Sequence, residues 1–355
     1  QSSEYLDLQV VATTMHFSEA FGNTYEQIEK DGFIIDEKIE NLLSSDTKRS
    51  VAKSTGLATI LLSDAFYRLD PDTVLLLGDR SETHAAATTA MLMNIHIAHI
   101  HGGEITEGAI DEKIRHSITK MSSLHFTSTD EYRNRVIQMG ENPNSVFCVG
   151  APGIDNIINT SLLSKCDLES ELCWKINGVT ALFTFHPETL STIDIKKEIK
   201  RILKVIKSVG INVLFTYANS DDGGMIINNE IEKFVYKDKN KYLVIKNLGQ
   251  LKYLSAMKHL DFVIGNTSSG IIEAASFHKP VVNIGSRQSG RLQSGNVIDT
   301  SIEKLEDSID KATSASFVKY CRNVENIYGD GNASGQIVTI LENNDPNIVK
   351  KFIDL

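Results

Sequence analysis

Short apolar runs alternate with helical patterns along the first half of this chain. The runs of strand length are Leu8–Ala12, Thr73–Leu77, Ile95–Ile100, Leu124–Thr127 and Val146–Val149. Between them, apolar residues recur at helical spacing over Val51–Leu69, Ser81–Met93, Asp111–Ser123 and Glu131–Met139. Strands that alternate with helices predict parallel βαβ units, with helices on both faces of the sheet.

The pattern weakens around residues 151–175 and then starts again. The second set of expected strands is Thr180–Phe185, Ile211–Thr216, Tyr242–Ile245, Asp261–Ile264 and Pro280–Ile284, and the expected helices include Ile193–Val209, Leu251–His259, Ile271–Phe277 and a C-terminal helix containing Ile337–Leu341. We therefore predict an α/β protein with two Rossmann-like, doubly wound domains over residues 1–165 and 166–335, followed by a C-terminal helical segment, 336–355. Their strand-end loops are expected to face an interdomain cleft.

Composition restricts the classes of function. The 355 residues are 41% hydrophobic and carry a net charge of -10, which argues against nucleic acid or a membrane surface as partner. No apolar run approaches the roughly 18 residues that span a bilayer. Four scattered cysteines without metal-ligand spacing indicate reduced thiols, so we expect a cytoplasmic protein. The chain opens with Gln1 and soon reaches a strand, so we expect that a first strand is missing from it.

Polar groups follow two adjacent predicted strands of the first domain. Gly78-Asp79-Arg80 ends one run, and His99 to Glu104 ends the next. Ligands of open α/β sheets bind outside the carboxyl ends of the strands, which favours a functional role for Asp79. The simpler alternative is a loop in which Asp79 pairs with Arg80.

Two interpretations of His99, His101 and Glu104 remain open. Two histidines two positions apart on an extended segment point to one face, so with Glu104 they can form a metal site. They can equally supply acid–base or positioning groups for an organic substrate, and a purely structural role is a third possibility. Asp111 and Arg115 are either an ordinary i,i+4 ion pair near a helix start or functional groups beside its buried stripe.

The second domain offers an anion site. Gly265-Asn-Thr-Ser-Ser-Gly270 joins a strand to a helix, and such a turn exposes backbone N–H groups and hydroxyls to a phosphate. Arg287 can add a second charge, Glu273 can accept hydrogen bonds from a ribose, and His186 ends a strand before Pro187. The loop is neither a Walker loop nor a nucleophile elbow.

Taken together, these segments resemble the hydrolysing UDP-N-acetylglucosamine 2-epimerases of sialic acid and nonulosonic acid biosynthesis. The resemblance runs from about Leu8 to about Gly335. It rests on residues 15–24, 78–80, 99–104, 109–120, 185–188, 265–270 and 285–288 in this order. One departure is His101, where some relatives carry a Glu before the Gly-Gly pair. A second is the absence of an initial Gly-Thr-Arg-type loop.

The resemblance implies a glycosyltransferase-B-like fold and a reaction that needs no metal and no cofactor. It implies that the nucleotide lies mainly on the second domain, and that the first domain presents catalytic groups to the sugar. The implied UDP-binding residues are Arg80, His186, Asn219, Asn247, Thr267, Ser268, Glu273 and Arg287. The implied catalytic residues are Asp79, Glu104, Asp111, His101 and Arg115, without individual roles.

We expect hydrolytic conversion of UDP-N-acetylglucosamine and water to N-acetylmannosamine and UDP. UDP is eliminated first, and the glycal-like intermediate is then hydrated. The alternative is the same chemistry on a UDP-diacetamido-trideoxyhexose. A non-hydrolysing 2-epimerase and a glycosyltransferase of the same fold rank lower. The expected partners are the UDP-sugar, UDP and further copies of the chain, as a homodimer or homotetramer.

Overall fold

The computed structural model describes residues 3–19, 22–43, 47–107, 110–188, 194–219, 223–344 and 348–354. The chain divides into two compact units. Unit 1 comprises Gln1–Ile105, Ile110–Asp155 and Tyr328–Leu355, and unit 2 comprises Thr106–Ala109 and Asn156–Ile327. None of the described helices is long and apolar enough to span a membrane.

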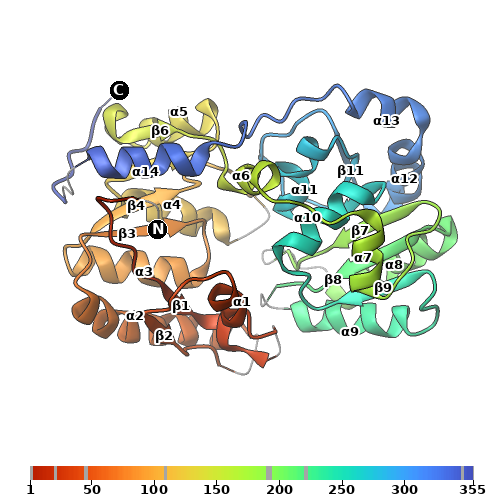
Figure 1. Cartoon of the computed structure of the whole chain (residues 1–355), viewed down its shortest axis with the longest axis horizontal. Helices are drawn as coiled ribbons and strands as arrows, with labels where there is room; N and C mark the ends of the chain where they lie inside the picture. Colours follow the sequence, from red (N-terminus) through yellow and green to blue (C-terminus); the bar gives the residue numbers. More distant parts are fainter. Residues whose placement is uncertain are drawn as a thin grey trace. The chain divides into compact units, whose positions relative to one another are not determined.

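Unit 1 contains a four-stranded parallel sheet in the order β3-β4-β5-β6 and a separate parallel pair, β1-β2 (Figure 1). The strands are β1 (Val11–Thr13), β2 (Glu37–Ile39), β3 (Thr73–Leu77), β4 (His96–Ile100), β5 (Leu124–Thr127) and β6 (Val146–Cys148). The helices are α1 (Tyr25–Lys30), α2 (Lys48–Leu69), α3 (Ser81–Leu92), α4 (Asp111–Met121), α5 (Asp130–Gln138), α6 (Pro152–Asn159), which crosses into unit 2, and α14 (Ala333–Asn343), with short 3-10 turns at η1 (Thr14–Phe17) and η3 (Pro143–Ser145).

Unit 2 is a six-stranded parallel sheet in the order β12-β11-β10-β7-β8-β9. Its strands are β7 (Thr180–Thr184), β8 (Asn212–Thr216), β9 (Tyr242–Ile245), β10 (Phe262–Gly265), β11 (Val281–Ile284) and β12 (Val297–Thr300). Its helices are α7 (Lys165–Leu172), α8 (Ile195–Val209), α9 (Gly224–Val235), α10 (Gly249–His259), α11 (Ser268–Ile272), α12 (Leu305–Thr313) and α13 (Ala315–Cys321), with 3-10 turns η4 (Ala274–Phe277) and η5 (Ile302–Lys304).

The order of the strands in unit 2 reverses between β7 and β10. From β7 the chain builds outward through β8 and β9, and from β10 it builds in the opposite direction through β11 and β12. In doubly wound sheets a ligand crevice forms where the order reverses, at the carboxyl ends of the two central strands. The fold therefore directs attention to the residues that follow Thr184 and Gly265.

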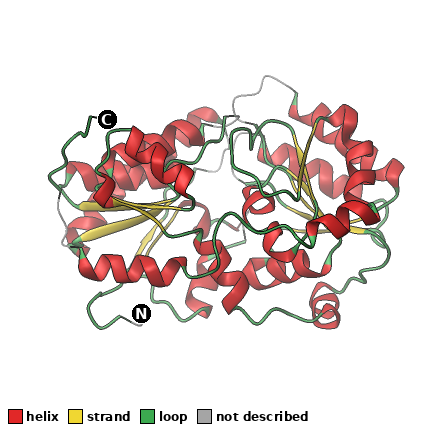
Figure 2. Ribbon diagram, turned by 90° about the horizontal axis from the view of Figure 1, so that it is seen from above, coloured by secondary structure: helices red, strands yellow, loops and turns green. Residues whose placement is uncertain are grey.

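Local sequence explains why these elements begin and end where they do. The Asp194 side chain accepts hydrogen bonds from the first N–H groups of α8, and the helix ends at Gly210 with a positive φ. The Thr129 hydroxyl caps α5 by accepting from Tyr132 N. Every residue of β7 and of β4 is buried, as expected of central parallel strands with helices on both faces (Figure 2).

The C-terminal helix α14 returns to unit 1. Figure 1 shows α14 beside the strands of unit 1, and Ala333 and Ile337 pack against the apolar side chains of β4 and β5. The Asp155 carboxylate accepts hydrogen bonds from the backbone N–H groups of Ala333 (2.9 Å) and Ser334 (2.6 Å), so it caps the start of this helix. Unit 1 is thus closed by residues from both halves of the chain.

Most strands predicted from the apolar runs are present with slightly shifted ends, whereas the predicted Leu8–Ala12 overlaps β1 only at Val11 and Ala12. The sequence missed β2 and β12, which are short and partly exposed and so lack an apolar run. The helix expected over Ile271–Phe277 is instead α11 followed by the turn η4. Ile193, the expected start of α8, lies outside the described residues.

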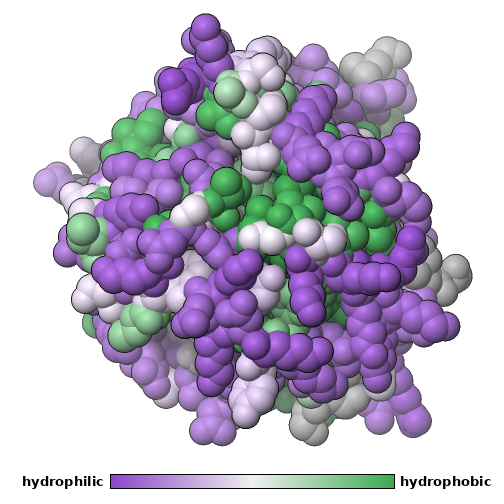
Figure 3. All heavy atoms as spheres, turned by 90° about the vertical axis from the view of Figure 1, so that its right-hand side faces the viewer, coloured by the Kyte–Doolittle hydropathy of each residue, from purple (hydrophilic) through white to green (hydrophobic). Residues whose placement is uncertain are grey.

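Hydrophilic side chains cover most of the face shown in Figure 3, and apolar ones gather near its centre.

Candidate active site

In unit 1, three of the predicted residues come together: Asp79 after β3, Glu104 after β4 and Arg115 on α4. The Arg115 guanidinium, whose side chain is only 1% exposed, forms an ion pair with Asp79 and a longer one with Glu112 (3.4 Å). Its Nη1 also donates to the backbone carbonyl of Glu104 (2.8 Å). A buried guanidinium needs such partners because desolvation of an unpaired charge is expensive. Arg115 therefore ties the two strand-end loops to α4.

The structure shows ion pairs that the sequence did not suggest. Asp79 pairs with Arg115 on α4, and Arg80 lies 3.5 Å from Glu82. On α4, Arg115 also forms an ion pair with Glu112, three positions before it. Asp111 is buried at the start of α4, where the helix dipole favours its carboxylate.

His99 has a structural role. It is fully buried, and its Nε2 donates to the carbonyl of Gly78 (2.8 Å), the residue before Asp79. Burial lowers the pKa of His99 to about 3, so the ring is neutral at physiological pH. His99 thus fixes the turn that presents Asp79.

The extended segment that was expected to carry both histidines ends at Ile100. His101 has φ +68° and lies outside β4, so the alternation that put His99 and His101 on one face does not continue to His101. Among the described residues, no three His, Cys, Asp or Glu side chains are arranged as a metal site requires. The metal interpretation of His99, His101 and Glu104 therefore has no support in the geometry.

His101 and Glu104 form a direct pair. The imidazole Nδ1 lies 2.7 Å from Glu104 Oε1, and the same oxygen accepts a hydrogen bond from the Ser128 hydroxyl (3.1 Å). Ser128 comes just before the cap of α5, and nothing in the sequence singled it out. The segments that follow β4 and β5 thus meet at the Glu104 carboxylate.

In unit 2, the residues after β7 and β10 are tied to each other at the point where the strand order reverses. The Asn266 side chain accepts from the backbone N–H of His186 (2.7 Å) and donates to the His186 carbonyl (2.9 Å). Gly265 has φ +135°, and a Cβ there would overlap the carbonyl oxygen of Thr184. Only glycine allows this close approach of the two strand ends.

The tautomer of His186 is set by a backbone contact. The backbone N–H of Asn219 donates to His186 Nδ1 (3.1 Å), so in the neutral ring the proton is on Nε2. His186 is therefore a hydrogen-bond donor through Nε2, as a ligand oxygen requires. Thr267 and Ser268 directly follow Asn266 in the chain and lie at the start of the short helix α11.

A loop after β11 adds positive charge to this cluster. Arg287 Nη1 lies 3.4 Å from the Asn266 carbonyl, and the Arg287 side chain is mostly buried. Glu188 holds this loop: it accepts hydrogen bonds from Ser286 N (2.6 Å), Ser286 Oγ (2.8 Å) and Arg287 N (3.1 Å). Glu188 directly follows His186-Pro187, which is the one sequence signal that could have found it.

The remaining predicted nucleotide residues have local partners. Glu273, at the end of α11, accepts a hydrogen bond from Ser269. Asn247 is exposed, and its side chain accepts from Gly249 N (2.8 Å) at the start of α10, which is an ordinary helix-capping contact. The Ala109 position of the resemblance lies outside the described residues.

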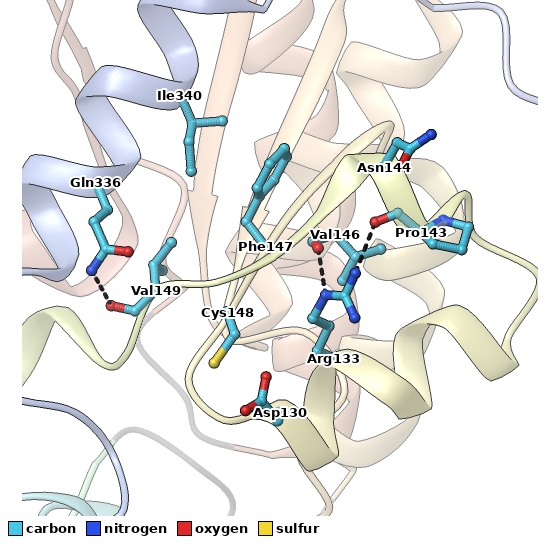
Figure 4. Close-up of a pocket in the computed structure, with 10 residues that line it drawn as sticks. All are labelled: Asp130, Arg133, Pro143, Asn144, Val146, Phe147, Cys148, Val149, Gln336 and Ile340. Atoms are coloured by element: carbon cyan, nitrogen blue, oxygen red, sulfur yellow. Dashed lines mark hydrogen bonds between the residues drawn. The ribbon is translucent and has the colours of Figure 1, made fainter.

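A groove beside β6 contains none of these residues (Figure 4). It lies along the open edge of the unit 1 sheet, where the Arg133 guanidinium donates to the carbonyls of Val146 (2.9 Å) and Pro143 (3.2 Å). Gln336 from α14 donates to the Val149 carbonyl (3.4 Å). These side chains occupy backbone acceptors that could otherwise pair with another strand.

A sequence model described as UDP-N-acetylglucosamine 2-epimerase matches residues 1–342. The chain belongs to this family. It is 44% identical over 318 residues to the GDP/UDP-N,N'-diacetylbacillosamine 2-epimerase (hydrolyzing) of Campylobacter jejuni, covering 89% of this chain and 83% of that protein. It is 34% identical over 342 residues to the UDP-N,N'-diacetylbacillosamine 2-epimerase (hydrolyzing) of Legionella pneumophila, covering 96% and 89%.

The fold agrees with this family. The crystal structure of UDP-GlcNAc 2-epimerase from Neisseria meningitidis bound to UDP-GlcNAc superposes with a TM-score of 0.80 at 20% identity, covering 96% of this chain and 93% of that one. The predicted glycosyltransferase-B-like architecture of two α/β domains is thereby confirmed.

Proposed function

We propose that this protein is a hydrolysing 2-epimerase of UDP-N,N'-diacetylbacillosamine, a diacetamido-trideoxyhexose. The observation that carries the proposal is its 44% and 34% identity, over most of the chain, to two proteins named for this reaction. This reverses the order expected from the sequence, which put UDP-N-acetylglucosamine first. That sugar remains the second candidate because a Neisseria meningitidis protein named UDP-N-acetylglucosamine 2-epimerase is 29% identical over 313 residues.

Unit 2 carries the groups suited to a nucleoside diphosphate. Neutral His186 donates through Nε2, Thr267 and Ser268 supply hydroxyls and backbone N–H groups, and Arg287 supplies charge. Glu273 is assigned to the ribose. In this proposal Asn219, Asn247 and Arg80 add contacts to the nucleotide, as the family resemblance implies.

Unit 1 carries the groups suited to the sugar. In the first step a base takes the proton from C2, the C–H electron pair forms the C1–C2 double bond, and UDP leaves with the C1–O electron pair. In the second step water adds its oxygen to C1, and C2 receives a proton on the opposite face. Asp79, Asp111, Glu104 and His101 are the proton-carrying candidates, and Arg115 holds Asp79 and the Glu104 backbone in place.

Proton NMR of the purified protein in D₂O tests the proposal with UDP-N,N'-diacetylbacillosamine, its GDP-linked counterpart and UDP-N-acetylglucosamine. The expected result is fastest turnover of the UDP-linked diacetamido sugar to the free, C2-inverted sugar with deuterium at C2, together with UDP. Faster turnover of UDP-N-acetylglucosamine selects the second candidate. A nucleotide-linked sugar as final product identifies a non-hydrolysing epimerase instead.

Asp79→Asn separates catalysis from binding. It should lower turnover by about 10²-fold or more while UDP affinity stays at the wild-type level, because Asp79 belongs to the sugar side of the proposal. Asp72→Asn, an exposed carboxylate just before the same strand, is the matched control and should turn over normally. Normal turnover of Asp79→Asn contradicts its assignment.

A further inference from the structure

The loop that follows β4 is held in a single conformation from two sides. Gly103 has φ +80°, and a Cβ there would overlap the carbonyl oxygen of Tyr132 on α5. The Arg135 guanidinium donates to the Gly103 carbonyl (2.5 Å), and Arg115 from α4 donates to the Glu104 carbonyl (2.8 Å). The backbone that carries His101 and Glu104 is therefore preorganised, as groups that move protons need to be.

His101 adopts a left-handed backbone conformation, with φ +68°. Residues with a Cβ disfavour this region, and glycine has no such penalty. Two glycines, Gly102 and Gly103, follow His101 directly in the chain. The backbone at His101 therefore suits glycine, and a glycine substitution can remove the imidazole without adding backbone strain.

The Glu104 carboxylate lies behind the imidazole. Its side chain is 3% exposed, against 15% for His101. Glu104 Oε1 contacts both His101 Nδ1 (2.7 Å) and the Ser128 hydroxyl (3.1 Å). In the part of the chain that the structure describes, His101 Nε2 has no hydrogen-bond partner. Nδ1 faces a carboxylate and therefore carries the proton of the neutral ring, which leaves a lone pair on Nε2.

We propose that His101, through Nε2, is the base that takes the C2 proton during elimination of UDP, that Glu104 is a positioning residue which fixes the tautomer of His101, and that Ser128 anchors Glu104. This inference rests on the proposed function. It gives individual roles to His101 and Glu104, which the family resemblance implies only as members of the catalytic group.

The Nε2 lone pair forms a bond to the C2 proton, the C2–H pair becomes the C1–C2 double bond, and the C1–O pair departs with the diphosphate. The imidazolium that forms is stabilised by the adjacent Glu104 carboxylate, as in other histidine–carboxylate pairs. Asp79 and Asp111 are then left for water activation and for the return of a proton to C2.

Replacement of His101 by glycine gives a sharp test because glycine suits the backbone at this position. His101→Gly should lower kcat by about 10²–10⁴-fold with UDP affinity unchanged, and added imidazole should restore turnover in a concentration-dependent way. His278→Gly is the matched control: it is an exposed histidine with φ +55° in unit 2, and the variant should be fully active and insensitive to imidazole.

The positioning role of Glu104 is tested by the tautomer of His101. Long-range ¹H–¹⁵N NMR of the wild-type protein should show His101 as the Nδ1–H tautomer, and Glu104→Gln should mix the tautomers and lower kcat more than it changes KM. Glu104→Asp should recover part of the turnover, and Ser128→Ala should have a smaller effect than Glu104→Gln.

The outcomes separate the two proposals. Full turnover by His101→Gly, or a loss of turnover that imidazole does not restore, overturns the assignment of His101 while the proposed function stands. A wild-type tautomer protonated on Nε2 also overturns it. If the wild-type protein turns over none of the three nucleotide sugars, the proposed function fails and the assignment fails with it.

Discussion

The buried, neutral His99 makes the stability of unit 1 depend on pH. In the unfolded chain its pKa is near 6.5, and in the folded protein burial lowers it to about 3. The unfolded state therefore binds more protons between these values. The contribution to stability is fully present above pH 6.5 and is lost as the pH falls toward 3.

The magnitude follows from the two pKa values. A shift of one pKa unit corresponds to about 1.4 kcal/mol. Protonation of His99 in the unfolded chain should therefore lower the free energy of unfolding by about 2 kcal/mol between pH 7 and pH 5. Across the whole range the loss reaches about 5 kcal/mol. Burial also lowers the pKa values of His125 and His96, and hydrogen bonds from His125, Lys120 and Lys350 lower the pKa of Glu141 to about 2. These groups change stability in the same direction.

His99→Gln isolates the contribution of His99 to the pH dependence of stability, because glutamine can still donate to the Gly78 carbonyl but does not titrate. The other groups are present in both proteins and cancel in the comparison. Urea unfolding at pH 7 and pH 5, with brief proteolysis and mass spectrometry of unit 1 peptides, gives the free energy of unfolding of that unit. The variant should lose about 2 kcal/mol less than the wild type between the two pH values. An equal loss in both proteins refutes the reasoning.

Two further variants test other features. Gly265→Ala should destabilise unit 2 by about 3 kcal/mol or more in urea unfolding, because its Cβ would overlap the Thr184 carbonyl; Gly249→Ala, also at a positive φ but in open space, should lose only about 1 kcal/mol, and equal losses contradict the packing argument. Lys350→Met removes an ammonium that donates to three backbone carbonyls, those of Thr119, Lys120 and Ser122, and pairs with buried Glu141. It should destabilise unit 1 by about 2–3 kcal/mol and hasten proteolysis of the C-terminal segment, whereas the exposed Lys351→Met should do neither.

The sequence predicted the elements well where apolar runs are continuous. Buried parallel strands such as β4 and β7 have apolar side chains on both faces, so their runs are recognisable without any alignment. The strand-end positions of Asp79, His186 and the Gly265–Gly270 loop followed from the same logic. The short, half-exposed β12 has no such signal.

The pairing of the site residues was not predictable from local sequence. Arg115 reaches Asp79 from a different element, and Ser128 reaches Glu104 from the segment after β5, so both contacts depend on the tertiary fold. The prediction that His101 continues the strand was wrong because the backbone turns left-handed after Ile100. A two-residue period applies only while the backbone stays extended.

The return of α14 to unit 1 has a consequence for synthesis on the ribosome. Ala98, Ile100, Leu124 and Phe126 are buried in part by Ala333 and Ile337, which are made more than two hundred residues after the first of them. Unit 2 is almost continuous in sequence and can close as soon as it emerges, while the earlier unit waits with one face of its sheet uncovered. Folding of this chain should therefore finish with its N-terminal unit, the reverse of the usual vectorial order, and the uncovered face is where chaperones should bind the nascent chain.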